Sequence, residues 1–285
     1  MVNEAMRQVW AETAPSWVEH EQVFDRVGSA AADAILAVAG IGPGDSVLDV
    51  GCGTGALLAA AIDAGASATG VDISAAMTEA AAARVPAADV LFADAQTEDL
   101  ASLSTAPFDR VVSRHGVMFF DDPVGAFANI RRACSDGARL AFVCWRTLAE
   151  NPTFTLGAPV LMARMPELPP MPPPGAPGPM SLAEPERVRG VLGDSGWADV
   201  TVEPLDYEFV YGAEGDDGVD ERVTMLLGTP MGQAMASTLE PALGPDGWAA
   251  LLDELRAEVR KHVVDGHVRH PAACWLVTAS SGSRA

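Results

Sequence analysis

The residues with the clearest chemical potential form a glycine turn. Gly51, Gly53 and Gly55 come directly after the apolar run 46–50, and a helix-forming run begins at Ala56. Glycine lets the backbone approach a ligand closely, and the first turn of a helix offers unpaired N–H groups. Glycine turns alone identify no ligand, so the interpretation depends on the acids around this one.

Three aspartates accompany the turn. Asp49 stands inside the apolar run before the glycines, and Asp72 and Asp94 close the next two apolar runs. A carboxylate at the end of the second strand suits a ribose diol, because it accepts two hydroxyl protons. Helix capping is the alternative role for Asp72. Together the glycines and acids favour a ligand that contains a nucleoside.

Short apolar runs that alternate with helix-forming stretches must position these residues. Five strands are predicted, at about residues 46–50, 68–71, 90–93, 108–112 and 139–145. This alternation implies right-handed crossovers and a parallel sheet covered on both faces. The predicted fold class is therefore α/β, a Rossmann-like doubly wound sheet.

Other segments flank this core. Further helices are predicted at 3–40, 123–133, 151–164, 184–192, 220–227, 231–239 and 247–264. Two more strands are predicted at 200–211, interrupted by Pro204, and at 273–279. Eight of the fourteen residues from Pro166 to Pro179 are proline, which predicts a stiff extended loop. We expect this loop to lie over the sheet rather than to link two domains.

At this point a family resemblance can be stated. Residues 47–55 (Val-Leu-Asp-Val-Gly-Cys-Gly-Thr-Gly) resemble the first motif of class I S-adenosylmethionine-dependent methyltransferases, and four later segments resemble the next motifs in order. These segments are 70–74, 92–95, 108–113 and 137–143. The subgroup that looks closest is that of the quinone-biosynthesis-type and natural-product methyltransferases, which act on small molecules. The resemblance covers residues 45–146 and, more loosely, the N-terminal helices and the last strand.

The resemblance implies a seven-stranded sheet, mostly parallel with an antiparallel last strand. One domain over residues 1–285 is expected, and it divides into four parts. These are an N-terminal helical cap at 1–40, a cofactor-binding core at 41–146, a proline-rich cap insertion at 147–196, and C-terminal strands and helices at 197–285.

The resemblance also implies cofactor roles. Gly51 and Gly53 would pass under the methionine part of S-adenosylmethionine, with Asp49 orienting its amino group. Asp72 would hold the ribose hydroxyls, and Ile73 would pack on the adenine.

At the far end of the cofactor, Asp94 would accept from the adenine amino group and Ala95 would donate a backbone N–H. Ser113 and Arg114 would line the floor near the methyl group. The full predicted cofactor set is Asp49, Gly51, Cys52, Gly53, Thr54, Gly55, Asp72, Ile73, Asp94, Ala95, Ser113 and Arg114.

The implied reaction is an in-line displacement, in which a nucleophile on a small acceptor attacks the methyl carbon and S-adenosylhomocysteine leaves. Alignment of the reactants can lower the barrier by roughly 7–11 kcal/mol. His115 is the candidate base, because its ordinary pKa of roughly 6.5 suits proton transfer near neutrality. The alternative is that His115 only shapes the substrate pocket.

An apolar or aromatic acceptor is expected. The predicted substrate-binding residues are Trp17, His20, His115 and Met118. The segment 151–180 would supply a second wall, and its methionines give that wall an adaptable apolar surface. They are Met162, Met165, Met171 and Met180.

Charge and lysine content exclude several rival classes. The chain has 18 basic and 39 acidic residues, a formal net charge of −21, which repels nucleic acids and anionic membranes. Lys261 is the single lysine; Ala257 precedes it by four and Arg260 by one. A Tyr-x-x-x-Lys reductase motif and a phosphate-binding loop are therefore absent. Gly193-Asp-Ser-Gly196 misses the G-x-S-x-G nucleophile motif by one residue.

Two alternatives stay open. A nicotinamide-dependent oxidoreductase is disfavoured by the early third glycine and by Asp94. A protein of the same fold that binds S-adenosylmethionine without methyl transfer is not excluded, because the cofactor motifs carry no information on the acceptor.

The remaining expectations concern metals, compartment and assembly. His267, His270 and Cys274 have loosely metal-like spacing, with Asp265 nearby. No metal is expected, because Cys274 lies in a predicted buried strand. Four scattered cysteines without a C-x-x-C pair, and no secretion signal, predict a cytoplasmic protein with reduced thiols. We expect a monomer or homodimer.

Overall fold

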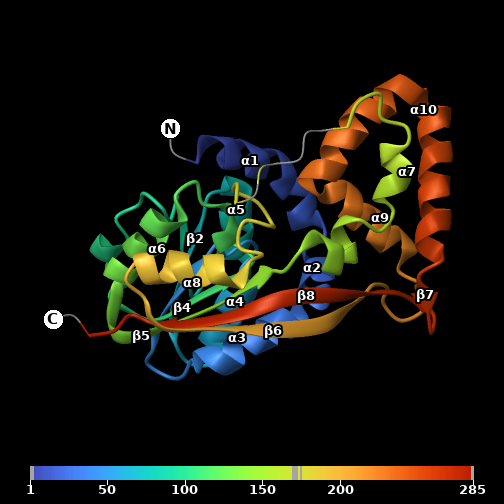
Figure 1. Cartoon of the computed structure of the whole chain (residues 1–285). Coiled ribbons are helices and arrows are strands. Elements are labelled where there is room, and N and C mark those ends of the chain that lie inside the picture. Colours follow the sequence, from blue (N-terminus) through green and yellow to red (C-terminus); the bar gives the residue numbers. More distant parts are fainter. Residues whose placement is uncertain (1–2, 169–172, 174, 284–285) are drawn as a thin grey trace.

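A mixed sheet forms the centre of the molecule (Figure 1), and the computed structural model describes residues 3–168, 173 and 175–283. Eight strands are found in the described part of the chain: β1 Ser46–Val50, β2 Ser67–Asp72, β3 Asp89–Phe92, β4 Phe108–Arg114, β5 Cys134–Trp145, β6 Ala198–Val210, β7 Val263–Val264 and β8 His267–Ser280. Their order is β3-β2-β1-β4-β5-β8-β6, and β7 pairs with β8. Strands β1 to β5 pair in parallel, whereas β8 runs antiparallel to β5 and β6. The predicted α/β class, with an antiparallel last strand, is confirmed.

Helices surround the sheet. The α-helices are α1 Glu4–Glu19, α2 Glu21–Val27, α3 Ser29–Ala39, α4 Ala56–Asp63, α5 Ala75–Arg84, α6 Pro123–Arg132, α7 Ala158–Met162, α8 Pro185–Asp194, α9 Val219–Gly228 and α10 Pro230–Arg260. Short 3-10 helices are η1 Leu100–Ser102, η2 Val117–Phe119, η3 Leu148–Glu150 and η4 Pro152–Phe154. Figure 1 shows α3 on one side of the sheet and α6 and α8 on the other. Both faces of the central strands are therefore covered.

Local sequence explains where several core helices begin. Ser74 accepts from the backbone N–H of Met77 and caps α5. Asp122 accepts from Gly125 and caps α6, with Pro123 in the first turn of that helix. The start of α6 agrees with the helix predicted at 123–133.

The edge strand β6 differs from the prediction. It runs without a break from Ala198 to Val210, although the sequence predicted an interruption at Pro204. Pro204 is opposite Trp275 of β8, and β6 has no second neighbour in the described sheet. The missing N–H of proline is tolerated because an edge strand needs donors on one side only.

The far ends of β6 and β8 carry a helical group made of α7, α9 and α10 (Figure 1). Helix α10 contains a break at Gly244, where φ is 66° and ψ is 175°, so it corresponds to the two helices predicted there. The second part ends at Arg260 rather than at residue 264, because Val263–Val264 pair with β8 instead. In the described residues of 151–164 only η4 and α7 are helical, since Gly157 adopts φ 88° between them.

The proline-rich loop is only partly described, because residues 169–172 and 174 lie outside the described chain. Its later part contacts the end of the β4 region. Gly178 donates its backbone N–H to the carbonyl of Met118 at 3.0 Å, and Ser181 donates its hydroxyl to the same carbonyl at 2.5 Å. This part of the loop is therefore attached to the core beside η2.

Candidate functional site

A cavity of about 730 Å³ lies at the carboxyl ends of the parallel strands. The glycine turn and the ends of β2 and β3 form one end of it. Helices α1, α2 and α9, the end of β4 with η2, the 148–162 segment and the start of α10 form most of the rest. A ligand crevice at this edge is the general rule for open parallel sheets.

Most of the predicted site residues meet in this cavity. Those that line it are Asp49, Gly51, Cys52, Gly53, Thr54, Asp72, Ile73, Asp94, Ala95, Arg114, Trp17, His115 and Met118. Three others are not among its lining residues: Gly55, Ser113 and His20. Gly55 packs under Ala81 of α5, Ser113 donates its hydroxyl to the carbonyl of Val50 at 2.7 Å, and His20 Nδ1 contacts the carbonyl of Ser16 at 2.8 Å.

Two glycines at the turn have different structural reasons. A Cβ added to Gly51 would lie 2.7 Å from Cα of Gly116, so the turn and the end of β4 touch backbone to backbone. A Cβ on Gly53 would meet nothing within 4 Å, although its φ of 52° also favours glycine. The space beside Gly53 is therefore open to a ligand.

Asp72 ties the glycine turn to β2. Its Oδ2 accepts the backbone N–H of Gly53 at 2.9 Å, and its Oδ1 accepts that of Ser74 at 2.9 Å. Burial raises the pKa of Asp72, and these backbone donors oppose that rise. The capping alternative is wrong for this residue, because Ser74 is the N-cap of α5.

Asp49 carries a buried and incompletely paired carboxylate. It is 1% exposed, and its Oδ1 has no hydrogen-bond partner among the described residues. Burial raises its pKa to about 7; nearby Arg114 lowers the pKa, and Asp72 adds to the rise. An ammonium group beside Asp49 would compensate this burial, so the site fits the amino group of the expected cofactor.

Arg114 provides the complementary charge. Its Nη2 lies 3.3 Å from Oδ1 of Asp25, which also pairs with Arg84 at 2.7 Å. Among the described residues that line the cavity, Arg114 is the only lysine or arginine. An amino-acid group has both an ammonium and a carboxylate, and Asp49 with Arg114 suit these two charges.

Asp94 has an unexpected partner. Nδ2 of Asn3 lies 2.9 and 3.0 Å from its two carboxylate oxygens. Asn3 is 2% exposed, donates its backbone N–H to Asp121 at 2.6 Å and accepts from the Asp121 backbone at 2.8 Å. The side-chain amide of Asn3 therefore contacts the same carboxylate that was predicted to bind the adenine amino group. No local sequence pattern predicts this contact, because Asn3 is 91 residues from Asp94 in the chain.

His115 lies at the end of β4 with φ 63°, an uncommon conformation for a residue with a side chain. Its ring stacks on Trp145, with centroids 4.2 Å apart and an angle of 7°. Burial, with a contribution from Arg114, lowers its pKa to about 3. The imidazole is therefore neutral over the physiological range.

Aromatic rings from α1 and α2 cover one side of the cavity. Trp17 stacks on Phe24, with ring centroids 3.7 Å apart. Trp10 lies edge-on to Trp17 and to Phe119, with centroid distances of 5.6 and 5.2 Å. All four rings line the cavity. Trp17, predicted to bind the substrate, therefore belongs to an aromatic cluster that also contains Trp10, Phe24 and Phe119.

Methionines from the 162–180 segment, α9 and α10 also line the cavity. Met162, Met180, Met225, Met231 and Met235 line the cavity. Of the four methionines predicted for the second wall, Met162 and Met180 line the cavity, Met165 is not among its lining residues, and Met171 lies outside the described residues.

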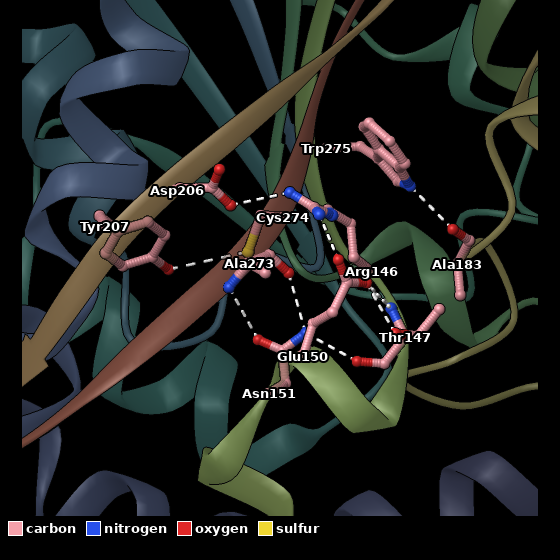
Figure 2. A network of polar contacts seen from close by, with 10 residues as sticks. All are labelled: Arg146, Thr147, Glu150, Asn151, Ala183, Asp206, Tyr207, Ala273, Cys274 and Trp275. Carbon is pink, nitrogen blue, oxygen red and sulfur yellow. Dashed lines mark hydrogen bonds and ion pairs between the residues drawn. The ribbon is translucent and has the colours of Figure 1, made fainter.

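A polar network attaches the segment that follows β5, which lines part of the cavity, to the sheet (Figure 2). Asn151, fully buried, donates to the carbonyl of Ala273 at 2.9 Å and accepts from its N–H at 2.9 Å, as a neighbouring strand would. Arg146 pairs with Glu150 and with Asp206, the latter at 2.8 Å. The segment that follows β5 therefore starts from a fixed point on β8.

Two further findings concern metals and membranes. The described residues contain no group of three or more His, Cys, Asp or Glu that could hold a metal ion. His270 instead contacts the hydroxyl of Tyr211 at 3.3 Å. Among the helices described, none combines the length and the apolar composition needed to span a bilayer.

Known proteins similar to this chain agree with the fold. A family described as "Methyltransferase domain" matches residues 48–142. A protein of Mycobacterium tuberculosis is 34% identical over 113 residues, which are 39% of this chain and 41% of the relative. The demethylmenaquinone methyltransferase of Renibacterium salmoninarum is 28% identical over 180 residues, 61% of this chain and 73% of that enzyme. Among solved structures, the YcgJ protein of Bacillus subtilis has a TM-score of 0.55 at 14% identity, over 89% of this chain and 99% of that one.

The extent of these matches differs between the core and the remainder. The chain spans less than half the length of the mycobacterial relatives it matches. The region matched by the family runs from β1 to β5 and includes the glycine turn, Asp72 and Asp94.

Proposed function

We propose that this chain is a class I S-adenosylmethionine-dependent methyltransferase and that it methylates a small, uncharged, apolar or aromatic acceptor; the match of residues 48–142 to a methyltransferase domain supports this. One observation carries the proposal. The cavity joins an acidic end at the glycine turn to an end lined by aromatic and methionine side chains. A cationic cofactor suits the first end, and an apolar acceptor suits the second.

The cofactor would be held by the residues of the acidic end. Asp49 and Arg114 would bind its amino-acid group, Asp72 its ribose, and Ile73 and Asp94 its adenine. When bound, S-adenosylmethionine supplies a methyl group on a sulfonium that is already activated for displacement. The protein then mainly has to align the acceptor with that group and exclude water.

The acceptor would lie beside the aromatic rings and the methionines that line the cavity. We propose that neutral His115 accepts a hydrogen bond from the methyl-accepting substrate. This bond would orient the nucleophilic atom of the substrate. A base of such low pKa holds a proton poorly, so the proton would pass on to solvent. The cytoplasmic location and the monomeric or dimeric state stay predictions from the sequence.

The test is to incubate the protein with methyl-labelled S-adenosylmethionine and a panel of neutral phenols, naphthols and hydroquinones. Labelled product and S-adenosylhomocysteine are expected in equal amounts. The matched control is Asp72→Ala, which should lose most of its affinity for S-adenosylhomocysteine in calorimetry.

Other results would change the proposal. Binding of S-adenosylhomocysteine without transfer to any acceptor would favour a binding protein of the same fold. Binding of NAD but not of S-adenosylhomocysteine would support the oxidoreductase alternative.

A further inference from the structure

Arg222 of α9 is a buried cation outside the cofactor residues. It is 1% exposed, and no ion pair joins it to a carboxylate in the described part of the chain. Burying a guanidinium is costly unless hydrogen bonds compensate. Its contacts should therefore identify what this arginine holds in place.

Arg222 donates hydrogen bonds to one turn, residues 153–156. Its Nη2 donates to the backbone carbonyl of Thr153 at 3.0 Å and to that of Leu156 at 2.7 Å. Its Nε has no partner among the described residues. The side chain thus clamps both flanks of Phe154, and Thr153, Phe154 and Thr155 line the cavity.

The clamped turn supports the aromatic end of the cavity. Phe154 lies edge-on to Trp145, with centroids 5.3 Å apart and an angle of 85°. The ring of Trp145 stacks in turn on His115. Arg222 is therefore connected to His115 through the backbone of the 153–156 turn, which carries Phe154, and then through Trp145.

The two ends of this turn are held differently. Asn151 fixes the first end to Ala273 of β8 (Figure 2). Arg222 holds the turn from α9 at the carbonyls of Thr153 and Leu156, and α9 also contributes Met225 and Leu226 to the cavity. Without Arg222 the two carbonyls would lose their donor, and the turn could shift relative to α9.

We infer that Arg222 is a positioning residue for the acceptor: by clamping the 153–156 turn it holds Phe154 against Trp145 and sets the width of the aromatic end. This role rests on the proposed function, since it assumes that the acceptor occupies that end. The cofactor end is formed by other elements, so Arg222 should affect binding of the two ligands unequally.

The experiment compares two ligands in three variants. The neutral fluorescent dye N-phenyl-1-naphthylamine is titrated into protein saturated with S-adenosylhomocysteine, and S-adenosylhomocysteine affinity is measured separately by calorimetry. Arg222→Met keeps the side-chain bulk and removes the donors, and Arg222→Lys retains one charged donor. Arg164→Met is the matched control, because Arg164 pairs with Glu254 on the surface at 2.9 Å. All titrations are made well below each variant's melting temperature.

Arg222→Met should weaken dye binding by about tenfold, the scale of one lost aromatic contact, and leave S-adenosylhomocysteine affinity within about twofold. Arg222→Lys should recover part of the loss, because an ammonium can reach one carbonyl but not bridge both. Arg164→Met should resemble the wild type. If Arg222→Met does not fold, Arg222→Lys and Phe154→Leu make the same comparison.

Unchanged dye affinity in the Arg222 variants would overturn the inference, as would equal weakening of both ligands or a wild type that binds no dye. Failure of methyl transfer in the wild type counts against the proposed function alone. The dye comparison then still decides the role of Arg222, because it needs no turnover.

Discussion

Asp49 is the residue whose ionisation bears most directly on cofactor binding. Its buried carboxylate has a pKa of about 7 in the ligand-free protein, so it is largely protonated below that pH. The ammonium group of a ligand requires the ionised form. A proton and the ligand therefore compete for Asp49.

We predict that affinity for S-adenosylhomocysteine falls as the pH is lowered from 8 to 6, by about tenfold, because the ionised fraction of Asp49 falls by about that factor. Calorimetry in buffers of different ionisation enthalpy should detect proton release near pH 7. Asp49→Asn should bind weakly, with no pH dependence in this range. A wild-type affinity that does not change with pH would contradict the assignment.

His115 makes a different prediction. Because burial lowers its pKa to about 3, its protonation does not change between pH 5 and 8. At saturating S-adenosylmethionine, where the titration of Asp49 no longer limits binding, the pH profile of kcat should therefore show no limb near 6.5, the ordinary value for histidine.

His115→Ala should lower turnover by about tenfold, the scale of one lost hydrogen bond, and leave S-adenosylhomocysteine affinity nearly intact. Initial rates and calorimetry measure the two effects. A limb near pH 6.5 that disappears in the variant would instead indicate a titrating base.

At the scale of elements, α1 is attached at its start by Asn3. Contacts from this one residue reach Asp94 after β3 and Asp121 before α6. Helix α1 also supplies Trp10 and Trp17 to the cavity, so its attachment affects both ends of the site.

We predict that Asn3→Ala speeds amide exchange in residues 4–19 by about tenfold, because several buried hydrogen bonds are lost at once. Hydrogen–deuterium exchange with mass spectrometry measures this directly. Gln8→Ala is the matched control, since Gln8 donates to the exposed Glu12 on the same helix. Equal protection in Asn3→Ala and the wild type would exclude an attachment role.

At the scale of the whole molecule, charge should select among acceptors. The formal net charge is −21, and Arg114 is the only lysine or arginine among the described residues that line the cavity. An anionic acceptor would meet repulsion outside and find few cationic partners inside.

Accordingly, a carboxylated analogue of any accepted phenol should have a kcat/KM at least about tenfold lower than the neutral parent. The difference should shrink as salt rises, because the screening length falls from about 10 Å at 0.1 M to about 3 Å at 1 M. Steady-state rates at several salt concentrations test this. Faster turnover of the anionic analogue would be inconsistent with the proposed acceptor class.

The sequence by itself determined the positions of the parallel strands, the glycine turn and the acids at the strand ends. These features depend on short-range patterns: apolar runs, glycines that need positive φ, and capping residues such as Ser74. Side chains at the carboxyl ends of adjacent parallel strands must converge, which is why Asp49, Asp72 and Asp94 meet in one cavity.

Only the tertiary structure decided which distant side chains complete the site. Asn3 reaches Asp94 across 91 residues, and Arg222 reaches the 153–156 turn across more than 60. Such contacts leave no periodic signal, since they depend on how the helices α1 and α9 pack over the sheet. The same holds for the electrostatics: Asp49 and His115 acquire their shifted pKa values from burial, a property of the assembled fold rather than of neighbours in the chain.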